Sequence, residues 1–424
     1  MKKHVVFVVG SYGKYMSPGA NIASKVWAEL QSSYDLDVTI ITRKEHYDDV
    51  VDGNENVLQI KDGATCFHHK CQEKLHLTKG MKRAYYKFLL KAKRAGHFIS
   101  MIVRRNSYSP KMKRKTLRAL KKLHAKKPID VLVPIGEPHD AMFAGLAFKK
   151  KNLSVKLMPY QLDRYANGLS LYKFPKLQKG LKRRNLKSEK KIIVYSEALF
   201  VLCPIYPHYQ QEFFLDVIDK VIPTEHPMII SHGENKKITD KEGAIKIAYA
   251  GSLDRKLRNP TEWLQTLCEL NDNSELNVQN RLFSFGNCGD IVGSYKEKLG
   301  QTLFDGGKIP YVQVIEEYQN SQFILTIGNR SKEEVPSKVF DCMSYGKPII
   351  HLYFFDEDPC LKYLEKYALA LCLPIGQDRI KENAIALEKF ISENNGKEIG
   401  FEQIEKLFED CTPKYVASMF YEKI

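Results

Sequence analysis

The sequence contains no apolar run long enough to cross a membrane. Its first apolar stretch, residues 5–9, stops at Gly10, whereas a membrane-spanning helix needs about 20 such residues. Its cysteines also form no disulfide pattern, because there are nine of them with no repeated spacing. A chain of this kind belongs in a reducing compartment. We therefore expect a cytoplasmic protein, soluble or held peripherally at the inner face of the plasma membrane.

Acidic residues are missing from residues 74–128, a stretch with nineteen lysines and arginines. The remaining 47 basic residues nearly balance the 50 acidic ones, so this stretch carries the formal net charge of +16. Within it, Met81, Ala84, Tyr85 and Phe88 recur at helical spacing among basic residues, which predicts basic amphipathic helices.

Helices of this kind bind anionic membrane surfaces, so we expect residues 81–127 to do so. Nucleic acid is a weaker expectation, because the aromatic residues lie on the apolar side of the helix and form no stacking platform. A solvated basic face, around a helix that packs on its own domain, is the other alternative.

The dinucleotide fingerprint G-x-G-x-x-G is absent, since Gly10, Gly13 and Gly19 have a different spacing. Residues 5–9 and 38–41 nevertheless predict strands on either side of a helix. This order opens a doubly wound α/β domain, in which ligands lie beyond the carboxyl ends of the strands. We expect the loop of Gly10 and Gly13 to line such a cleft, with a tight turn as the alternative.

Two polar residues of the first half follow expected strands. His139 comes just after the strand at 131–133, in the loop before a helix at 141–149, and Asp163 follows the strand at 155–158. Functional side chains gather at the carboxyl ends of parallel strands. We therefore expect both residues in the cleft, although a loop or capping role is the alternative for His139.

A short segment of the second half has both ends of a helix marked. Pro336 suits a first turn, Gly346 suits the end about ten residues later, and residues 349–352 predict a buried strand. Free backbone N–H groups at the helix start, with Ser337 and Lys338, predict a phosphate site.

Two acids accompany this helix at a spacing of eight. Glu333 lies in the preceding loop, and Asp341 lies one turn into the helix, where its carboxylate can accept hydrogen bonds from ribose hydroxyls. Together with the phosphate site, they suit a nucleoside diphosphate that carries a sugar. An ordinary capped helix in an α/β domain is the alternative.

This segment resembles the nucleotide-sugar motif of retaining glycosyltransferases of the family 4 type, which have the GT-B fold. In that family two glutamates stand eight apart ahead of a Gly-x-Pro. Glu333, Asp341, Gly346 and Pro348 fit that spacing, with Asp341 where glutamate is usual. The resemblance implies that Glu333 contacts the hydroxyls of the donor sugar and that Asp341 contacts the ribose.

The resemblance extends to a loop rich in cations, from Gly251 to Pro260. In the family, an arginine and a lysine of a glycine-led loop hold the diphosphate. Arg258 matches the lysine, Ser252 stands where the arginine is expected, and either Arg255 or Lys256 would supply the missing cation. A polar turn is the alternative. The backbone after Gly286 would hold the base.

The fold class implied is α/β, with two Rossmann-like doubly wound domains facing each other across a cleft. A polar segment after Pro227 marks the change of domain. The expected parts are an acceptor domain with the basic helices at 1–235, a nucleotide-sugar domain at 243–411, and a tail at 412–424 that crosses back to the first domain.

The activity implied is transfer of a sugar, with retention, from a nucleoside-diphosphate sugar to a saccharide or lipid-linked acceptor in bacterial cell-surface polysaccharide biosynthesis. We expect a uridine nucleotide and no metal or other cofactor, because cations neutralise the diphosphate. Cys66 and Cys71 bracket two histidines but lack a second cluster to complete a zinc site.

The expected catalytic residues are Glu333, His139 and Arg258. The expected donor-binding residues are Ser252, Arg255, Arg258, Gly286, Pro336, Ser337, Lys338 and Asp341. The residues expected to line the acceptor cleft are Gly10, Gly13 and Asp163.

Two other functions compete with this one. A UDP-sugar 2-epimerase shares the fold and would act on the donor without an acceptor. A non-catalytic scaffold that binds membranes or nucleic acid would bind no nucleotide sugar.

Overall fold

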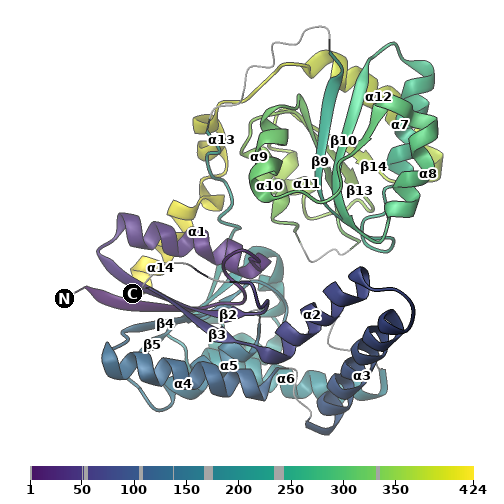
Figure 1. The fold of residues 1–424 in the computed structure, drawn as a ribbon. Coiled ribbons are helices and arrows are strands. Elements are labelled where there is room, and N and C mark those ends of the chain that lie inside the picture. The colour runs from purple at the N-terminus through teal and green to yellow at the C-terminus, as the bar shows by residue number, and fades with distance from the viewer. Residues whose placement is uncertain are drawn as a thin grey trace. The chain divides into compact units, whose positions relative to one another are not determined.

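The computed structural model describes residues 2–49, 51, 56–104, 108–136, 138–166, 175–233, 243–330 and 335–424, with only the backbone of residues 97, 98, 100–104 and 175–179. The chain forms two compact units (Figure 1). Unit 1 comprises Met1–Pro227 and Pro413–Ile424, and unit 2 comprises Met228–Thr412.

Unit 1 is built on parallel strands in the order β3-β2-β1-β4-β5, beside a smaller parallel sheet in the order β6-β7-β8. Its strands are β1 (Lys3–Val8), β2 (Leu36–Lys44), β3 (Val57–Lys61), β4 (Val131–Pro134), β5 (Lys156–Leu157), β6 (Tyr160–Gln161), β7 (Leu199–Leu202) and β8 (Val221–Thr224). Its helices are α1 (Pro18–Ser33), α2 (Gly63–Leu77), α3 (Gly80–Arg104), α4 (Pro110–Lys126), α5 (Asp140–Lys149), α6 (Pro175–Tyr195) and α14 (Pro413–Lys423), with 3-10 turns at Cys203–His208 and Glu212–Lys220.

Alternation along β1 gives its two faces different partners. Val6 and Val8 join a buried cluster with residues of α4 and α5, while the ring of Phe7 meets Trp27 of α1 edge to face at 5.5 Å. Successive side chains of a strand point to opposite faces, so helices cover both sides of the sheet. The expected doubly wound architecture of the first half is therefore confirmed.

The last helix of the chain, α14, packs within unit 1 against α1. Tyr421 stacks on Tyr34 with ring centroids 4.1 Å apart, and Phe420 stacks on Phe200 at 3.8 Å. The terminal segment therefore completes the core of unit 1.

Unit 2 contains a six-stranded parallel sheet in the order β11-β10-β9-β12-β13-β14. Its strands are β9 (Ile245–Leu253), β10 (Val278–Gly286), β11 (Leu303–Asp305), β12 (Phe323–Ile327), β13 (Ile349–Tyr353) and β14 (Ala370–Pro374). Its helices are α7 (Thr261–Asn273), α8 (Gly289–Leu299), α9 (Tyr311–Gln319), α10 (Lys338–Met343), α11 (Leu361–Leu364), α12 (Ile380–Asn394) and α13 (Phe401–Leu407), with 3-10 turns at Gly300–Thr302, Gln377–Arg379 and Glu409–Cys411.

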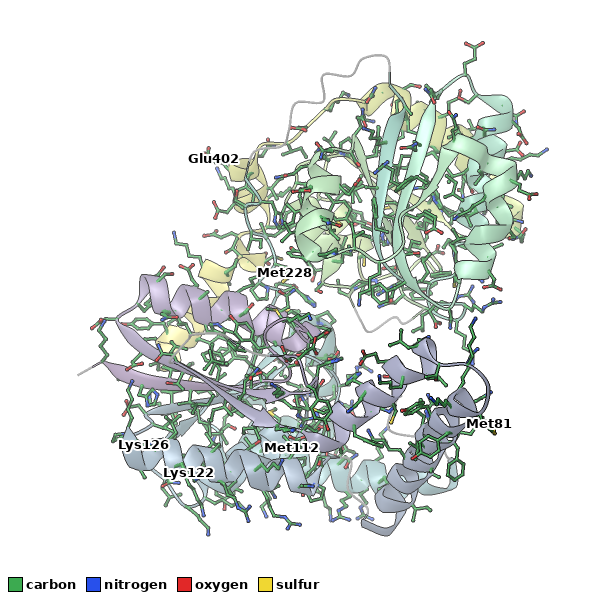
Figure 2. All side chains as sticks on the ribbon, viewed as in Figure 1. Met81, Met112, Lys122, Lys126, Met228 and Glu402 are labelled. Atoms are coloured by element: carbon green, nitrogen blue, oxygen red, sulfur yellow. The ribbon has the colours of Figure 1, made fainter. Side chains whose placement is uncertain are left out.

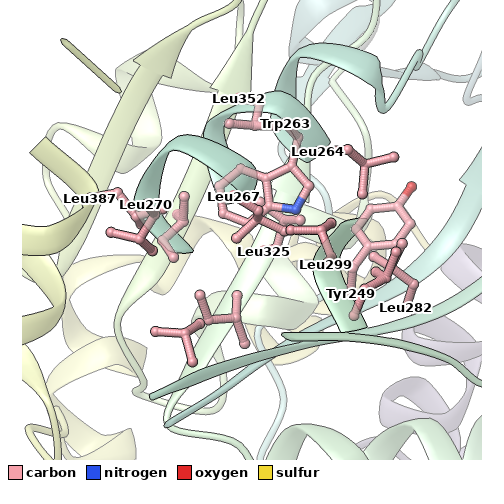
Figure 3. Close-up of a cluster of buried hydrophobic side chains, with 14 of the residues drawn as sticks. Tyr249, Trp263, Leu264, Leu267, Leu270, Leu282, Leu299, Leu325, Leu352 and Leu387 are labelled. Carbon is pink, nitrogen blue, oxygen red and sulfur yellow. The ribbon is translucent and has the colours of Figure 1, made fainter. Parts of the chain in front are cut away.

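The main core of unit 2 lies between its sheet and helices α7, α8 and α12. Trp263 and Leu267 of α7 and Leu387 of α12 are buried there against strand residues such as Leu325, as Figure 3 shows. The Trp263 indole N–H also donates a hydrogen bond to Asn280 Oδ1 at 3.0 Å. Because the strand order of unit 2 is that of a Rossmann fold, both units are Rossmann-like.

Among the described helices, none combines the length and the apolar character that crossing a bilayer requires.

Candidate functional site

The sheet of unit 2 has a topological switch point between β9 and β12. These neighbouring strands pair in parallel, and the chain winds outward from them in opposite directions along the sheet. Open α/β sheets bind ligands beyond the carboxyl ends of the strands at such a point. A pocket lies at this place, lined by Tyr249, Gly251, Arg258, Thr326, Ile327, Pro336, Lys338, Val339, His351 and Cys360.

Arg258 contributes a guanidinium group to this pocket. Its backbone closes a small loop after β9, because Arg258 and Asp254 exchange N–H to carbonyl hydrogen bonds of 2.8 and 3.1 Å. Its Nη1 donates to Ser252 Oγ at 3.0 Å, but its buried Nε has no hydrogen-bond partner among the residues that the structure describes. No carboxylate of the described residues pairs with it. A partly buried guanidinium with a spare donor is suited to phosphate, which it can bind through two N–H groups.

Lys338 contributes a second cation to the same pocket. Its Nζ lies 5.5 Å from the ring centroid of Tyr318, and within the described ranges no carboxylate forms an ion pair with it. Burial lowers the pKa of Lys338 from its ordinary value of 10.5. Two cations on one pocket, without a counter-ion among the described residues, suit an anion, and an anion bound there would favour the charged form of the lysine.

Helix α10 is shorter than the sequence predicts. It has six residues, Lys338–Met343, and Ser337 precedes it without a side-chain capping bond. At its end, Tyr345 and Gly346 donate to carbonyls three residues back, at 3.3 and 3.0 Å, so the last turn tightens into a 3-10 geometry. Both cations therefore matter more for the anion site than the start of so short a helix.

The polar side of α10 is covered by protein. Asp341 is 5% exposed, and its Oδ1 is hydrogen-bonded to His232 Nε2 at 2.9 Å and to the Tyr311 hydroxyl at 3.2 Å. The His232 ring also stacks on Tyr345 at 4.4 Å. The segment at the start of unit 2 therefore packs over this side of the helix. The ribose contact of Asp341 stays a prediction.

Other expected donor residues lie at the edge of this site or outside the description. Glu333 belongs to residues 331–334, outside the described residues. Arg255 forms an exposed ion pair with Asp290, whereas Arg258 pairs with no carboxylate in the described ranges. Gly286 ends β10 with a φ of 130°, and a Cβ there would lie 2.0 Å from the Leu253 carbonyl oxygen. Only glycine fits this position.

In unit 1, His139 lines a separate small hollow together with Gln161, Glu189 and Tyr209. Burial lowers the pKa of His139 from 6.5, so the ring is neutral at physiological pH. Glu189 accepts a hydrogen bond from the Tyr209 hydroxyl at 2.7 Å. The other expected residue, Asp163, is exposed and is not among the residues that line this hollow.

The glycines after β1 form a tight turn that is tied to the neighbouring strand. The Gly10 carbonyl accepts hydrogen bonds from Thr42 Oγ1 at 2.7 Å and from the Arg43 N–H at 3.0 Å, and a Cβ on Gly10 would lie 2.7 Å from Ser17 Oγ. Gly13 has a φ of 136°. The turn is thus demanded by the fold, and a role in an acceptor cleft stays a prediction.

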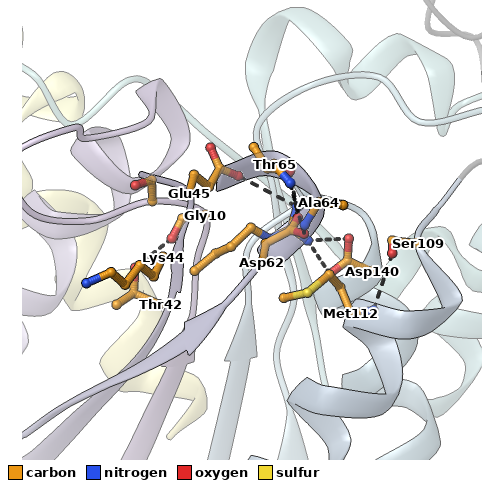
Figure 4. A network of polar contacts seen from close by, with 12 residues as sticks. Gly10, Thr42, Lys44, Glu45, Asp62, Ala64, Thr65, Ser109, Met112 and Asp140 are labelled. Carbon is orange, nitrogen blue, oxygen red and sulfur yellow. Dashed lines mark hydrogen bonds and ion pairs between the residues drawn. The ribbon is translucent and has the colours of Figure 1, made fainter. Parts of the chain in front are cut away.

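Sequence reasoning missed the ion pair beside this turn (Figure 4). Arg43 pairs with Asp140, and both side chains are at most 12% exposed. Asp62 and Glu45 lie 3.7 Å from the same guanidinium. Three carboxylates therefore share one guanidinium in this cluster at the carboxyl edge of the sheet. In the sequence, only the position of these residues after strands could have indicated the ion pair.

Helix α3 exposes the apolar side that the sequence predicts for it. Met81, Tyr85 and Phe88 are 91%, 58% and 66% exposed, and Figure 2 marks Met81 at the start of the helix. The opposite side faces α2, where Lys93 Nζ donates to the Ala64 carbonyl at 2.6 Å. The helix thus packs on α2 while its apolar stripe is exposed, and both membrane binding and a solvated basic face stay predictions.

Comparisons with known proteins identify the fold. No model of a known family matches the chain, and no curated protein matches its sequence. Solved structures do match it over nearly its full length. A glycosyltransferase from Rickettsia africae ESF-5 has a TM-score of 0.58 and 11% identity, and the match covers 99% of this chain and 97% of that one.

Two further solved structures match the chain to a similar degree. UDP-GlcNAc 2-epimerase from Neisseria meningitidis bound to UDP-GlcNAc has a TM-score of 0.57 and 12% identity, with 99% of both chains covered. A mutant of S. aureus TarM, in complex with fondaparinux, alpha-GlcNAc-glycerol and UDP, has a TM-score of 0.56 and 12% identity, with 99% and 98% covered. The chain has the GT-B fold. At such low identity the likeness shows the fold alone, and transferases and epimerases are equally near.

Proposed function

We propose that the protein is a retaining glycosyltransferase that uses a UDP-linked sugar. The observation that carries the proposal is the pocket at the switch point of unit 2, where Arg258 and Lys338 present two cations without a described counter-ion. A nucleoside diphosphate is the anion that a Rossmann-like unit of the GT-B fold is suited to place there.

In this proposal the two cations act on the leaving group. Cleavage of the sugar–phosphate bond leaves negative charge on the diphosphate, and a cation already in place lowers the barrier to that step. Arg258 donates hydrogen bonds to two phosphate oxygens, and Lys338 neutralises the remaining negative charge. No divalent ion is then required to neutralise the diphosphate.

The sugar and the acceptor complete the reaction. Glu333, just ahead of Pro336, would hold the donor sugar's hydroxyls, and Asp341 would meet the ribose beside His232. The acceptor hydroxyl attacks from the face that the diphosphate leaves, and the leaving phosphate takes its proton, so the configuration is retained. A lipid-linked saccharide of cell-surface polysaccharide synthesis fits a protein that docks on a membrane through α3.

A thermal-shift titration with UDP tests donor binding, because a ligand that binds only the folded state raises its apparent stability. We expect the wild type to show a saturable rise in Tm. Arg258→Gln should weaken UDP at least tenfold, since a charged hydrogen bond contributes about 1.5–3 kcal/mol. Lys389→Gln, which removes an exposed cation on α12, is the control and should bind as the wild type does. Equal affinity in both variants would remove Arg258 from the site.

Glu333→Ala tests the sugar contact separately. We expect it to abolish sugar transfer while UDP still shifts the Tm, because the carboxylate touches the sugar and leaves the phosphates alone. Initial rates, measured for the variant and the wild type with each nucleotide sugar and the acceptor that the wild type uses, show the effect. Full activity in the variant would place the sugar contact on another residue.

The second candidate is a UDP-sugar 2-epimerase, which the fold comparison favours as strongly as a transferase. Incubating the protein with UDP-GlcNAc and no acceptor separates the two. Conversion of the sugar or release of UDP at a catalytic rate under those conditions would favour the epimerase, whereas turnover only with an acceptor supports the transferase.

A further inference from the structure

Three potential metal ligands meet at the wall of the unit 2 pocket. His351 lies on β13, and Asp358 and Cys360 lie in the loop that follows it. All three are buried, and one ligand atom from each falls within 4.8 Å of the others. His351 and Cys360 also line the pocket itself.

The imidazole of His351 is fixed by its other nitrogen. Thr326 Oγ1 lies 2.8 Å from His351 Nδ1, and the same hydroxyl reaches the Ile350 carbonyl at 3.4 Å. A hydroxyl that donates to the carbonyl accepts from Nδ1–H, which leaves a lone pair on Nε2. Hydrogen bonds of this kind orient histidines that bind metals.

That lone pair faces a carboxylate oxygen. His351 Nε2 and Asp358 Oδ2 are 3.7 Å apart, with each side chain 1% exposed, and neither atom has a hydrogen-bond partner in the part of the chain that is described. A separation of 3.7 Å is too long for a hydrogen bond. It suits two ligands of one ion, because bonds of about 2.0–2.2 Å in a tetrahedron place ligand atoms roughly 3.3–3.6 Å apart.

The loop aims Asp358 at the same point. Its Oδ1 accepts the Cys360 N–H at 2.8 Å, which leaves Oδ2 for another partner. A Cβ on residue 328 would lie 2.2 Å from that Oδ2, so glycine at this position makes room for the carboxylate.

We propose that His351 Nε2, Asp358 Oδ2 and Cys360 Sγ bind one zinc ion. A thiolate, an imidazole and a carboxylate match the ligand preferences of zinc, whereas magnesium prefers oxygen ligands alone. The negative charges of the thiolate and the carboxylate together balance the charge of the zinc ion. Three protein ligands leave a fourth position, which the pocket leaves open to water or to an oxygen of a bound ligand. This proposal departs from the sequence expectation of no metal, and it holds whether or not the protein transfers sugars.

Zinc content tests the proposal without any assay of activity. The full-length protein is incubated with zinc, dialysed against metal-free buffer and analysed by mass spectrometry of its metals. We expect about one zinc per chain in the wild type and less than a tenth of that in Asp358→Asn and Cys360→Ser. Cys268→Ala removes a buried thiol of α7 outside the cluster and should keep the zinc.

A second measurement uses only the wild type and so does not depend on how the variants fold. Cobalt(II) in the same site should give the intense ligand-field absorption of tetrahedral cobalt and a thiolate-to-cobalt charge-transfer band, both displaced by zinc. Wild-type protein that keeps no zinc, or that gives no thiolate band with cobalt, overturns the proposal. Folded Cys360→Ser protein that keeps one zinc overturns it as well, because the ion would then lie elsewhere.

Discussion

At the scale of single residues, Lys338 should make nucleotide binding depend on pH. Burial lowers its pKa below 10.5, and a bound diphosphate favours its charged form. Affinity for UDP should therefore fall as the pH rises through that lowered pKa, in a range where the phosphates are already fully ionised. Lys338→Arg stays charged throughout, so its affinity should stay level. Isothermal titration between pH 7.5 and 10 measures both, and parallel profiles would show that Lys338 does not touch the anion.

Single residues also show how far the site could be predicted. The cations of the pocket were predicted because Arg258 and Lys338 follow a strand and begin a helix, and these local patterns fix their positions. The partner of Asp341 was not predicted, because His232 lies more than a hundred residues away in a polar segment without periodicity. The zinc ligands stand close together in the sequence. His351, however, was counted within an apolar strand, and the burial that distinguishes Asp358 from the exposed Asp356 is not visible in the sequence.

At the scale of elements, the end of α10 depends on one glycine. Gly346 has a φ of 70°, and a Cβ there would lie 2.1 Å from the Ile399 carbonyl oxygen. Gly346→Ala therefore adds a backbone clash to a left-handed strain of about 1–2 kcal/mol. We expect the thermal unfolding temperature to fall by about 5 °C or more.

The matched control for this substitution is Gly396→Ala. Gly396 has a φ of 79° and nothing within 4 Å of an added Cβ, so this variant carries the strain without the clash. Its loss of stability should be about half as large or less. Equal losses in the two variants, measured by calorimetry, would mean that the backbone moves away from Ile399 at little cost.

The elements themselves were largely predictable, and their lengths were not. Continuous apolar stretches predicted β1, β4 and β13 close to their observed bounds, because a parallel strand buried on both faces is apolar throughout. The expected ten-residue helix became the six residues of α10, since backbone hydrogen bonds to carbonyls three residues back tighten its end. Packing decides whether the end of a helix forms hydrogen bonds to carbonyls three or four residues back, and the sequence does not show the outcome.

At the scale of the whole molecule, the net charge of +16 is concentrated on unit 1, where α3 places exposed apolar residues among exposed basic ones. We propose that this surface docks on anionic membranes. Each basic residue near such a surface contributes about 1 kcal/mol. Replacing Lys82, Arg83, Lys87 and Lys91 with glutamine should therefore weaken sedimentation with phosphatidylserine vesicles at least tenfold.

The control for that experiment loses the same charge elsewhere, at four exposed lysines of unit 2, namely Lys381, Lys389, Lys397 and Lys406. A second variant keeps all charges of α3 and replaces Met81, Tyr85 and Phe88 with serine. Docking through α3 predicts that the control sediments as the wild type does and that the serine variant is weakened, because the apolar side chains enter the boundary between headgroups and acyl chains. If the control is weakened as much as the α3 glutamine variant, the vesicles respond to net charge alone and α3 is not the docking surface.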